Sequence, residues 1–174
     1  MKNFIYVLLS LTFLFMACEG DQGPPGLNGL SADEYAALSF EVSPVDFQYN
    51  PDNGLQEALI ALPYNLLDSD VVLVYRLEDV VTVNGQATDA WAPLPQNFFL
   101  EDANIIQYVF NHTYADVELL IDGNFELSTL DSAYTQNQVF RIVILPADLL
   151  NLNIDVSQLD AVIEAYNITD FEAL

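Results

Sequence analysis

One apolar segment, residues 71–77 (VVLVYRL), constrains the fold of this chain more than any other stretch. It is rich in β-branched residues and nearly continuous in apolar character, which is typical of a strand buried on both faces. Residues 139–145 (VFRIVIL) have the same character and are followed by Pro146, which cannot continue a strand ladder. These two segments predict the central strands of a sheet.

Shorter segments alternate apolar and polar side chains, the period of a strand with one face on a core. The apolar positions that share a face are Leu38, Phe40 and Val42; Ile106, Tyr108 and Phe110; and Val117, Leu119 and Ile121. For the first set there is an alternative, because Ser31 and Glu34 have the spacing of a capping box that would start a short helix. We prefer the strand.

Turn signals separate these segments. Residues 51–54 (PDNG), 101–104 (EDAN) and 122–124 (DGN) are rich in residues that tolerate tight turns. Asn84-Gly85 is the preferred pair for a type I′ turn, so it predicts a hairpin over residues 81–88. We expect antiparallel strands joined by short connections.

Two segments depart from the strand pattern. Trp91, followed by Pro93 and Pro95, predicts an irregular stretch. A helical period occurs only near the C terminus, with Asp155 or Ser157 as the expected N-cap. The apolar stripe of this helix comprises Leu159, Val162, Ile163 and Tyr166. The sequence therefore predicts an all-β fold, an antiparallel β-sandwich with one short C-terminal helix, as a single domain over residues 32–174.

The first 17 residues have the parts of a secretory signal peptide: Lys2, an apolar run over residues 4–17 and a small residue before the cut. The run is shorter than the about 20 residues that a membrane-spanning helix needs. Phe15-Met16-Ala17-Cys18 follows the bacterial lipobox pattern, although Phe15 stands where leucine is common, so we expect cleavage after Ala17 and lipidation of Cys18. The alternative is a chance cysteine after an ordinary signal peptide or an apolar anchor.

Residues 18–31 contain glycine at every third position from Gly20 to Gly29. That period is required in a collagen triple helix, but so few triplets favour a partly extended spacer over a trimer. Glu19 and Asp21 resemble the export tags that direct some bacterial lipoproteins to the outer face of the outer membrane.

The charge of the chain is strongly negative: 26 Asp and Glu residues face 3 Lys and Arg residues, and the formal net charge is -23. Such a surface repels nucleic acid and anionic lipid headgroups, so a nucleic-acid partner is excluded. Self-repulsion penalises the compact state at low ionic strength, which suggests adaptation to a salty or calcium-containing exterior. With its only cysteine lipidated, the domain has no disulfide and depends on burial.

The whole chain resembles a family of small bacterial surface lipoproteins with a short collagen-like head, often called collagen-like proteins. The resemblance is carried by residues 18–26 (CEGDQGPPG), residues 71–75, Trp91 with Leu94-Pro95, and residues 138–146 (QVFRIVILP). It implies a lipid anchor and surface display, but no established activity. Relatives are sometimes labelled dihydrolipoamide dehydrogenase, and we reject that label because this chain has no G-x-G-x-x-G motif and no redox cysteine pair.

Catalytic signals are weak. His112 is the only histidine, and no G-x-S-x-G elbow accompanies it. Adjacent carboxylates suited to glycoside hydrolysis are expected by chance among so many acids. We therefore expect a protein that is not an enzyme.

Calcium is the cofactor that the acidic turns suit best, although none is required. Asp68, Asp70, Glu101, Asp102 and Asp122 lie in predicted loops and offer hard oxygen ligands. None of these clusters matches the D-x-[DN]-x-[DN]-G pattern, so solvated turn residues are the alternative.

Three further side chains are candidates for binding. Arg76 and Arg141 lie within apolar strands, so each is expected to pair with carboxylates or carbonyls or to reach the sheet rim, and capture of an anionic ligand is the alternative. Trp91 could stack on a sugar, whereas core packing is the default for aromatic residues among strands.

These observations lead to one expected function. The chain is expected to be a lipid-anchored, non-enzymatic structural or interaction module on the bacterial outer membrane. Its expected partner is a surface glycan or a protein. The alternative is a calcium-assisted carbohydrate-binding domain, for which an exposed Trp91 beside an acidic loop would be diagnostic.

Overall fold

The computed structural model describes residues 37–147 and 153–174. All of them belong to one compact unit, Ser31–Leu174. The predicted signal peptide, Cys18, the glycine-rich spacer and the capping-box alternative lie outside the described residues. Within the described residues, no helix is both long enough and apolar enough to cross a bilayer.

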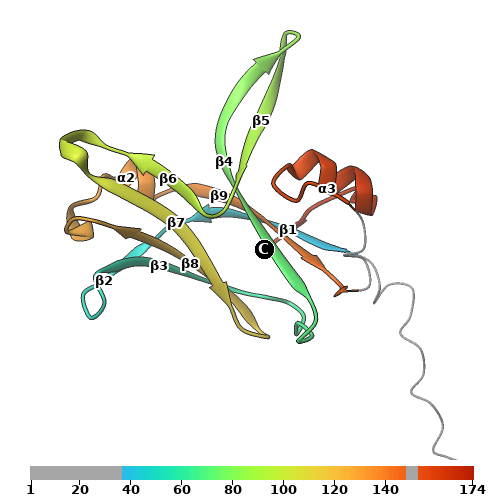
Figure 1. Cartoon of the computed structure of the whole chain (residues 1–174), viewed down its shortest axis with the longest axis horizontal. Helices are drawn as coiled ribbons and strands as arrows, with labels where there is room; N and C mark the ends of the chain where they lie inside the picture. Colours follow the sequence, from blue (N-terminus) through green and yellow to red (C-terminus); the bar gives the residue numbers. More distant parts are fainter. Residues whose placement is uncertain (1–36, 148–152) are drawn as a thin grey trace, which may run out of the picture. The chain divides into compact units, whose positions relative to one another are not determined.

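The described residues form two five-stranded sheets, which confirms the predicted all-β sandwich (Figure 1). Sheet A has the order β10-β1-β9-β4-β5, and sheet B has the order β2-β3-β8-β7-β6. The strands are β1 (Leu38–Val45), β2 (Gln48–Asn50), β3 (Leu55–Ala61), β4 (Val71–Val83), β5 (Gln86–Pro93), β6 (Gln96–Phe99), β7 (Ile105–His112), β8 (Asp116–Gly123), β9 (Gln138–Leu145) and β10 (Glu172–Ala173). Paired strands are antiparallel except β1 and β10, which are parallel.

Four short helical segments lie wholly within the described residues: η3 (Glu101–Ala103), η4 (Leu127–Thr129), α2 (Ser132–Thr135) and α3 (Leu159–Tyr166). The predicted C-terminal helix is α3, but its predicted N-cap is wrong, because Gln158 occupies that position without a side-chain cap bond. The Asp155 carboxylate instead accepts hydrogen bonds from the Ser157 backbone N–H at 3.0 Å and from its hydroxyl at 2.6 Å. Both predicted caps are thus used in the turn before the helix.

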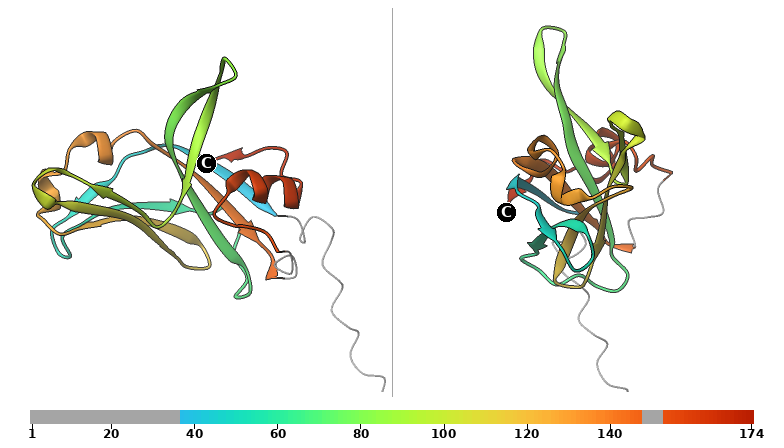
Figure 2. Two further views of the ribbon diagram at one scale, coloured as in Figure 1. Left: turned by 45° about the horizontal axis from the view of Figure 1, so that its top comes forward. Right: turned by 90° about the vertical axis from the view of Figure 1, so that its left-hand side faces the viewer.

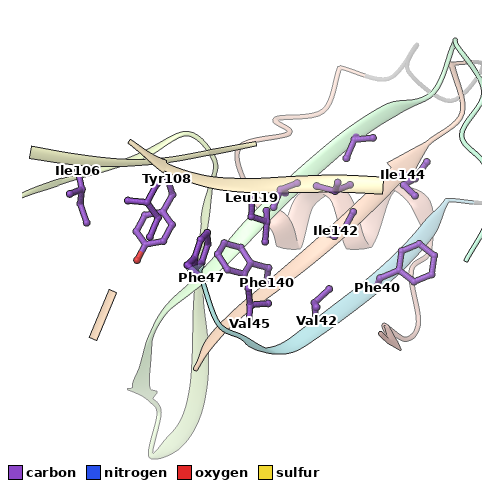
Figure 3. Packing of buried hydrophobic residues seen from close by; sticks show 14 of the residues in the cluster. Phe40, Val42, Val45, Phe47, Ile106, Tyr108, Leu119, Phe140, Ile142 and Ile144 are labelled. Carbon is purple, nitrogen blue, oxygen red and sulfur yellow. The ribbon is translucent and has the colours of Figure 1, made fainter. Parts of the chain in front are cut away.

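The main core lies between the two sheets (Figure 3). The apolar residues predicted to share a face in β1, β7 and β8 all belong to it. Phe47, between β1 and β2, packs edge-on against Tyr108 and Phe140, with ring centroids 5.9 and 6.0 Å apart. Burial of such side chains, each contributing about 1.5–3 kcal/mol, is what stabilises a domain without disulfides.

A second apolar cluster covers the outer face of sheet A, where α3 packs (Figure 2). Val143 and Leu145 of β9 belong to this cluster together with Leu159 and Val162 of α3. The neighbouring β9 residues Phe140, Ile142 and Ile144 face the inter-sheet core. The sheet is therefore covered on both faces at β9, which explains why residues 139–145 are apolar at successive positions rather than alternate ones.

Strands β4 and β5 both run further than the sequence predicted. The hairpin turn at Asn84 (φ 52°) and Gly85 (φ 81°) is confirmed, and both residues adopt the positive φ that a type I′ turn requires. The irregular segment predicted at Trp91 is wrong, because β5 continues through Trp91 to Pro93. Pro93 is tolerated there because it is the last residue of an edge strand, where a missing N–H costs little.

Candidate functional site

The five acids predicted as calcium ligands lie in three separate places: the loop before β4, the short helix η3, and the last part of strand β8. Asp68 and Asp70 belong to the loop before β4, where the Asp70 Oδ2 accepts a hydrogen bond from the Leu67 backbone N–H at 2.9 Å. The Leu66 backbone N–H donates to the Tyr114 carbonyl at 2.7 Å, which places this loop beside the turn between β7 and β8.

The other predicted ligands lie at the opposite end of β8. Glu101 and Asp102 form part of η3, between β6 and β7, and Asp122 lies next to the last residue of β8. The Asn124 Oδ1 accepts a hydrogen bond from the Ile105 backbone N–H at 2.8 Å, so these two turns are neighbours. The structure thus brings three of the five acids to one end of the sandwich and leaves Asp68 and Asp70 at the other.

No group of three or more His, Cys, Asp or Glu side chains among residues 37–147 and 153–174 is placed to hold a metal ion. The Asp122 Oδ1 accepts a hydrogen bond from the Gly123 backbone N–H at 2.7 Å, at the end of β8. Calcium binding stays a prediction from the sequence.

A hollow of about 720 Å³, open to solvent, lies beside the Glu101 turn. Figure 1 shows that α2 and the connection between β6 and β7, which contains η3, lie at the same end of the sandwich. Its lining comes from two stretches of chain, residues 99–104 and 125–134. The lining residues are Phe99, Leu100, Glu101, Asp102, Asn104, Phe125, Thr129, Leu130, Asp131 and Tyr134. The hollow therefore combines aromatic rings with carboxylates.

The wall formed by η3 has an unusual backbone. Asp102 (φ 56°) and Ala103 (φ 59°) are two successive non-glycine residues in the left-handed region, a conformation that costs free energy and persists only where the surroundings hold it. Asn124 supplies such a hold, because its Nδ2 donates to the Ala103 carbonyl at 3.1 Å while its Oδ1 accepts from Ile105. This contact fixes the turn that carries Glu101 and Asp102.

The aromatic part of the hollow was not predicted. Phe99 is 80% exposed, although it is a large apolar ring, and Tyr134 is half-buried with its ring edge-on to Phe98 at 5.8 Å. Asp131 caps α2, with its Oδ1 accepting from the Ala133 backbone N–H at 2.8 Å. No local sequence pattern joins Phe99 to residues 125–134, because only the tertiary fold brings the two stretches together.

Trp91, the predicted sugar-stacking residue, lies half-buried on the outer face of sheet A. The Arg141 guanidinium lies over its ring, 4.1 Å from the centroid, and over the ring of Phe171 at 4.2 Å. The Arg141 Nε also donates to the Glu41 Oε2 at 2.9 Å, the one ion pair among the described residues. Carbohydrate binding would be favoured by an exposed tryptophan beside an acidic loop. Trp91 is instead half-buried and packed against Arg141.

Arg76 is a buried cation, 8% exposed. Its Nε and Nη2 donate to the Gln138 side-chain carbonyl at 2.9 and 2.6 Å, and its guanidinium lies over the rings of Tyr108 (4.7 Å) and Phe98 (5.2 Å). The prediction that both arginines pair with carboxylates or carbonyls is confirmed. The burial of Arg76 leaves little access for the anionic ligand that was the alternative.

The remaining catalytic candidate, His112, is exposed at the last residue of β7. Its Nδ1 lies 3.4 Å from the carbonyl oxygen of the adjacent Thr113. This contact belongs to the turn between β7 and β8.

The most exposed part of the fold is the outer half of the β4–β5 hairpin, residues 78–89, which we call the arm. Figures 1 and 2 show that it extends away from both sheets, and every residue in it is exposed. Val80, Val81 and Val83 are 54%, 39% and 48% exposed, and among the described strands β5 has β4 as its only neighbour. The arm thus presents apolar side chains together with a free backbone edge.

The fold and these surfaces define an acidic β-sandwich with a projecting hairpin and an aromatic, acidic hollow at one end. Comparison of the chain with known protein families, with curated proteins and with solved structures gave no match.

Proposed function

We propose that this chain is a lipid-anchored, non-enzymatic interaction module of a bacterial cell surface, held in the outer membrane through Cys18 and contacting a protein partner through the arm. The anchor rests on the sequence Phe15-Met16-Ala17-Cys18 and on the apolar run before it. The resemblance to collagen-like surface lipoproteins agrees with this placement.

The observation that carries the interaction role is the arm itself. A two-stranded ribbon standing alone in water is at best marginally stable, and this one leaves three valines in solvent. Residues 80–88 (VVTVNGQAT) carry no charge in a chain whose net charge is -23. A partner strand that paired with the edge of β5 would bury these valines and satisfy the free backbone groups, as in β-strand addition.

The calcium-assisted carbohydrate-binding alternative has less support. It depends on Trp91 as a stacking platform, and that ring already packs against Arg141. Among residues 37–147 and 153–174 the arm has no comparable partner, so contact with a protein strand is the better supported form of the proposal.

The test uses the full chain in intact bacterial cells, with a photo-crosslinking amino acid at Val81 in the arm. We expect a discrete crosslinked species from this position and recovery of the chain in the outer-membrane fraction. Asp68, an exposed residue of the loop before β4, is the matched control position for crosslinking.

Two results would count against the proposal. Equal crosslinking from Val81 and Asp68 would mean that the arm is not the contact surface. A Cys18→Ala chain that fractionated with the membrane like the unaltered chain would mean that Cys18 is not the anchor.

A further inference from the structure

The hollow beside η3 is a second surface, distinct from the arm, and its size points to a ligand with several side chains. Its volume of about 720 Å³ falls within the usual range of binding sites, which is about 300–1,000 Å³. A single metal ion would leave most of it empty, and it opens to solvent, so an extended ligand can enter without any change in the fold.

The aromatic rings of the hollow suit a cation. A guanidinium or ammonium group placed over an aromatic face is attracted by the ring quadrupole. Within this same protein, both described arginines are held in that way, with four guanidinium-to-centroid distances between 4.1 and 5.2 Å. Phe99, 80% exposed at the mouth of the hollow, has no such cation over it among the described residues.

The charged residues of the hollow also favour a cationic ligand. Glu101, Asp102 and Asp131 line it, and the two described arginines are engaged elsewhere, Arg76 with Gln138 and Arg141 with Glu41. These three acids are not placed to share one metal ion. Carboxylates spread around aromatic rings instead fit an organic cation on an apolar stem. The carboxylates would pair with the positive charge, and the aromatic rings would pack against the apolar stem.

We propose that this hollow binds an extended basic segment of a partner protein, with a lysine or arginine side chain lying over Phe99 and its charge near Glu101 and Asp102. The proposal goes beyond the interaction role of the arm and does not depend on it. A peptide segment is favoured over a free amine because the hollow is larger than one lysine side chain and has room for its neighbours.

The experiment measures fluorescence anisotropy of a labelled tetralysine peptide with the full chain in nonionic detergent, at about 0.15 M salt, where long-range attraction is largely screened. The test variants are Glu101→Gln/Asp102→Asn and Phe99→Ser. Asparagine tolerates the left-handed backbone at position 102, and Phe99 is exposed, so we expect both variants to fold like the unaltered chain.

The matched control is Asp52→Asn/Asp68→Asn, which removes the same charge at two exposed sites outside the hollow. We expect the Glu101/Asp102 variant to weaken tetralysine binding about tenfold and the control to weaken it at most about twofold. We expect Phe99→Ser to weaken binding about threefold while the melting temperature stays unchanged.

Equal weakening by the test and control variants would overturn the proposal, because it would show only the general attraction of a cation to an acidic protein. Cadaverine, maltotriose and calcium chloride serve as competitors. Displacement of tetralysine by cadaverine at equal concentration would identify a free amine as the ligand, and displacement by maltotriose or by calcium would identify a sugar or a metal. Each of these displacements would overturn the peptide proposal.

Discussion

Two buried tyrosines, Tyr75 and Tyr108, make the stability of the fold depend on the protonation of single side chains. Each hydroxyl donates a hydrogen bond of 2.6 Å to a backbone carbonyl, that of Val156 and that of Tyr134 respectively. Burial raises the pKa of each phenol from 10.0 to about 12, and at Tyr108 the nearby Arg76 acts in the opposite direction. Both groups are therefore neutral donors over the whole neutral range.

This has a consequence at alkaline pH. The unfolded chain loses these protons near the ordinary tyrosine pKa of 10.0, whereas the folded protein keeps them until about pH 12. The free energy of unfolding is thus unaffected by these groups below pH 10 and falls as the pH rises towards 12. We expect the urea midpoint, followed by circular dichroism, to decrease over this interval.

Tyr75→Phe should make the alkaline decrease shallower, because Tyr108 is then the only one of these two buried phenols that contributes. A midpoint that stayed constant up to about pH 12 in the unaltered chain would contradict the raised pKa values.

At the scale of elements, the C-terminal segment is held to sheet A by a few specific contacts. The Ser39 hydroxyl donates to the Asp170 carbonyl at 2.7 Å, and the Leu174 backbone N–H donates to the Glu41 carbonyl at 3.0 Å. Arg141 adds its stack on Phe171. Since β10 has only two residues, these contacts decide whether it stays paired.

Arg141→Met should therefore loosen β10 first. It removes the bond to Glu41 and both ring contacts, and because the site is partly exposed we expect a loss of about 1–2 kcal/mol in the free energy of unfolding. Hydrogen exchange should show faster exchange at Leu174 before any change in β9.

Arg141→Lys is the informative comparison, since lysine keeps the charge but not the flat stacking surface. Full retention of stability in the lysine variant would mean that the ion pair alone matters. No loss of stability in the methionine variant would mean that the contacts of Arg141 are not structural.

Sequence patterns predicted the strands and turns whose own residues determine which face is buried or where the chain turns. The alternation through Tyr108 in β7 and Leu119 in β8 could be read directly, as could the turn at Asn84. The strand through Trp91 could not, because flanking prolines are a local signal whereas β5 is held by pairing with β4. Phe99 could be predicted as part of a hairpin, but not as part of a hollow whose other wall comes from residues 125–134.

At the scale of the whole molecule, charge opposes the compact state. The chain carries 26 Asp and Glu residues. Among the described residues only one of these acids, Glu41, forms an ion pair. Repulsion between exposed carboxylates is screened by salt, with a Debye length of about 10 Å at 0.1 M. Stability should therefore rise with ionic strength before any specific ion is bound.

We expect the melting temperature to increase by about 3 °C between low salt and about 0.3 M NaCl, and to level off beyond that. Sucrose at equal osmolarity should not reproduce the initial steep rise. An unchanged melting temperature over this range would show that the repulsion is already relieved by spacing, and the idea of adaptation to a salty exterior would be abandoned.

The strand order of sheet A has a mechanical consequence. The chain enters this sheet at the start of β1, and Leu38 lies at the level of Ile144 in β9 and of Val72 in β4, whereas the arm extends from the other end of β4. A pull between a tether before β1 and a held arm would thus run along the strands. The hydrogen bonds that join β1 to β9 and β9 to β4 would be loaded together in shear, so the domain should resist extension better than a sheet opened one bond at a time.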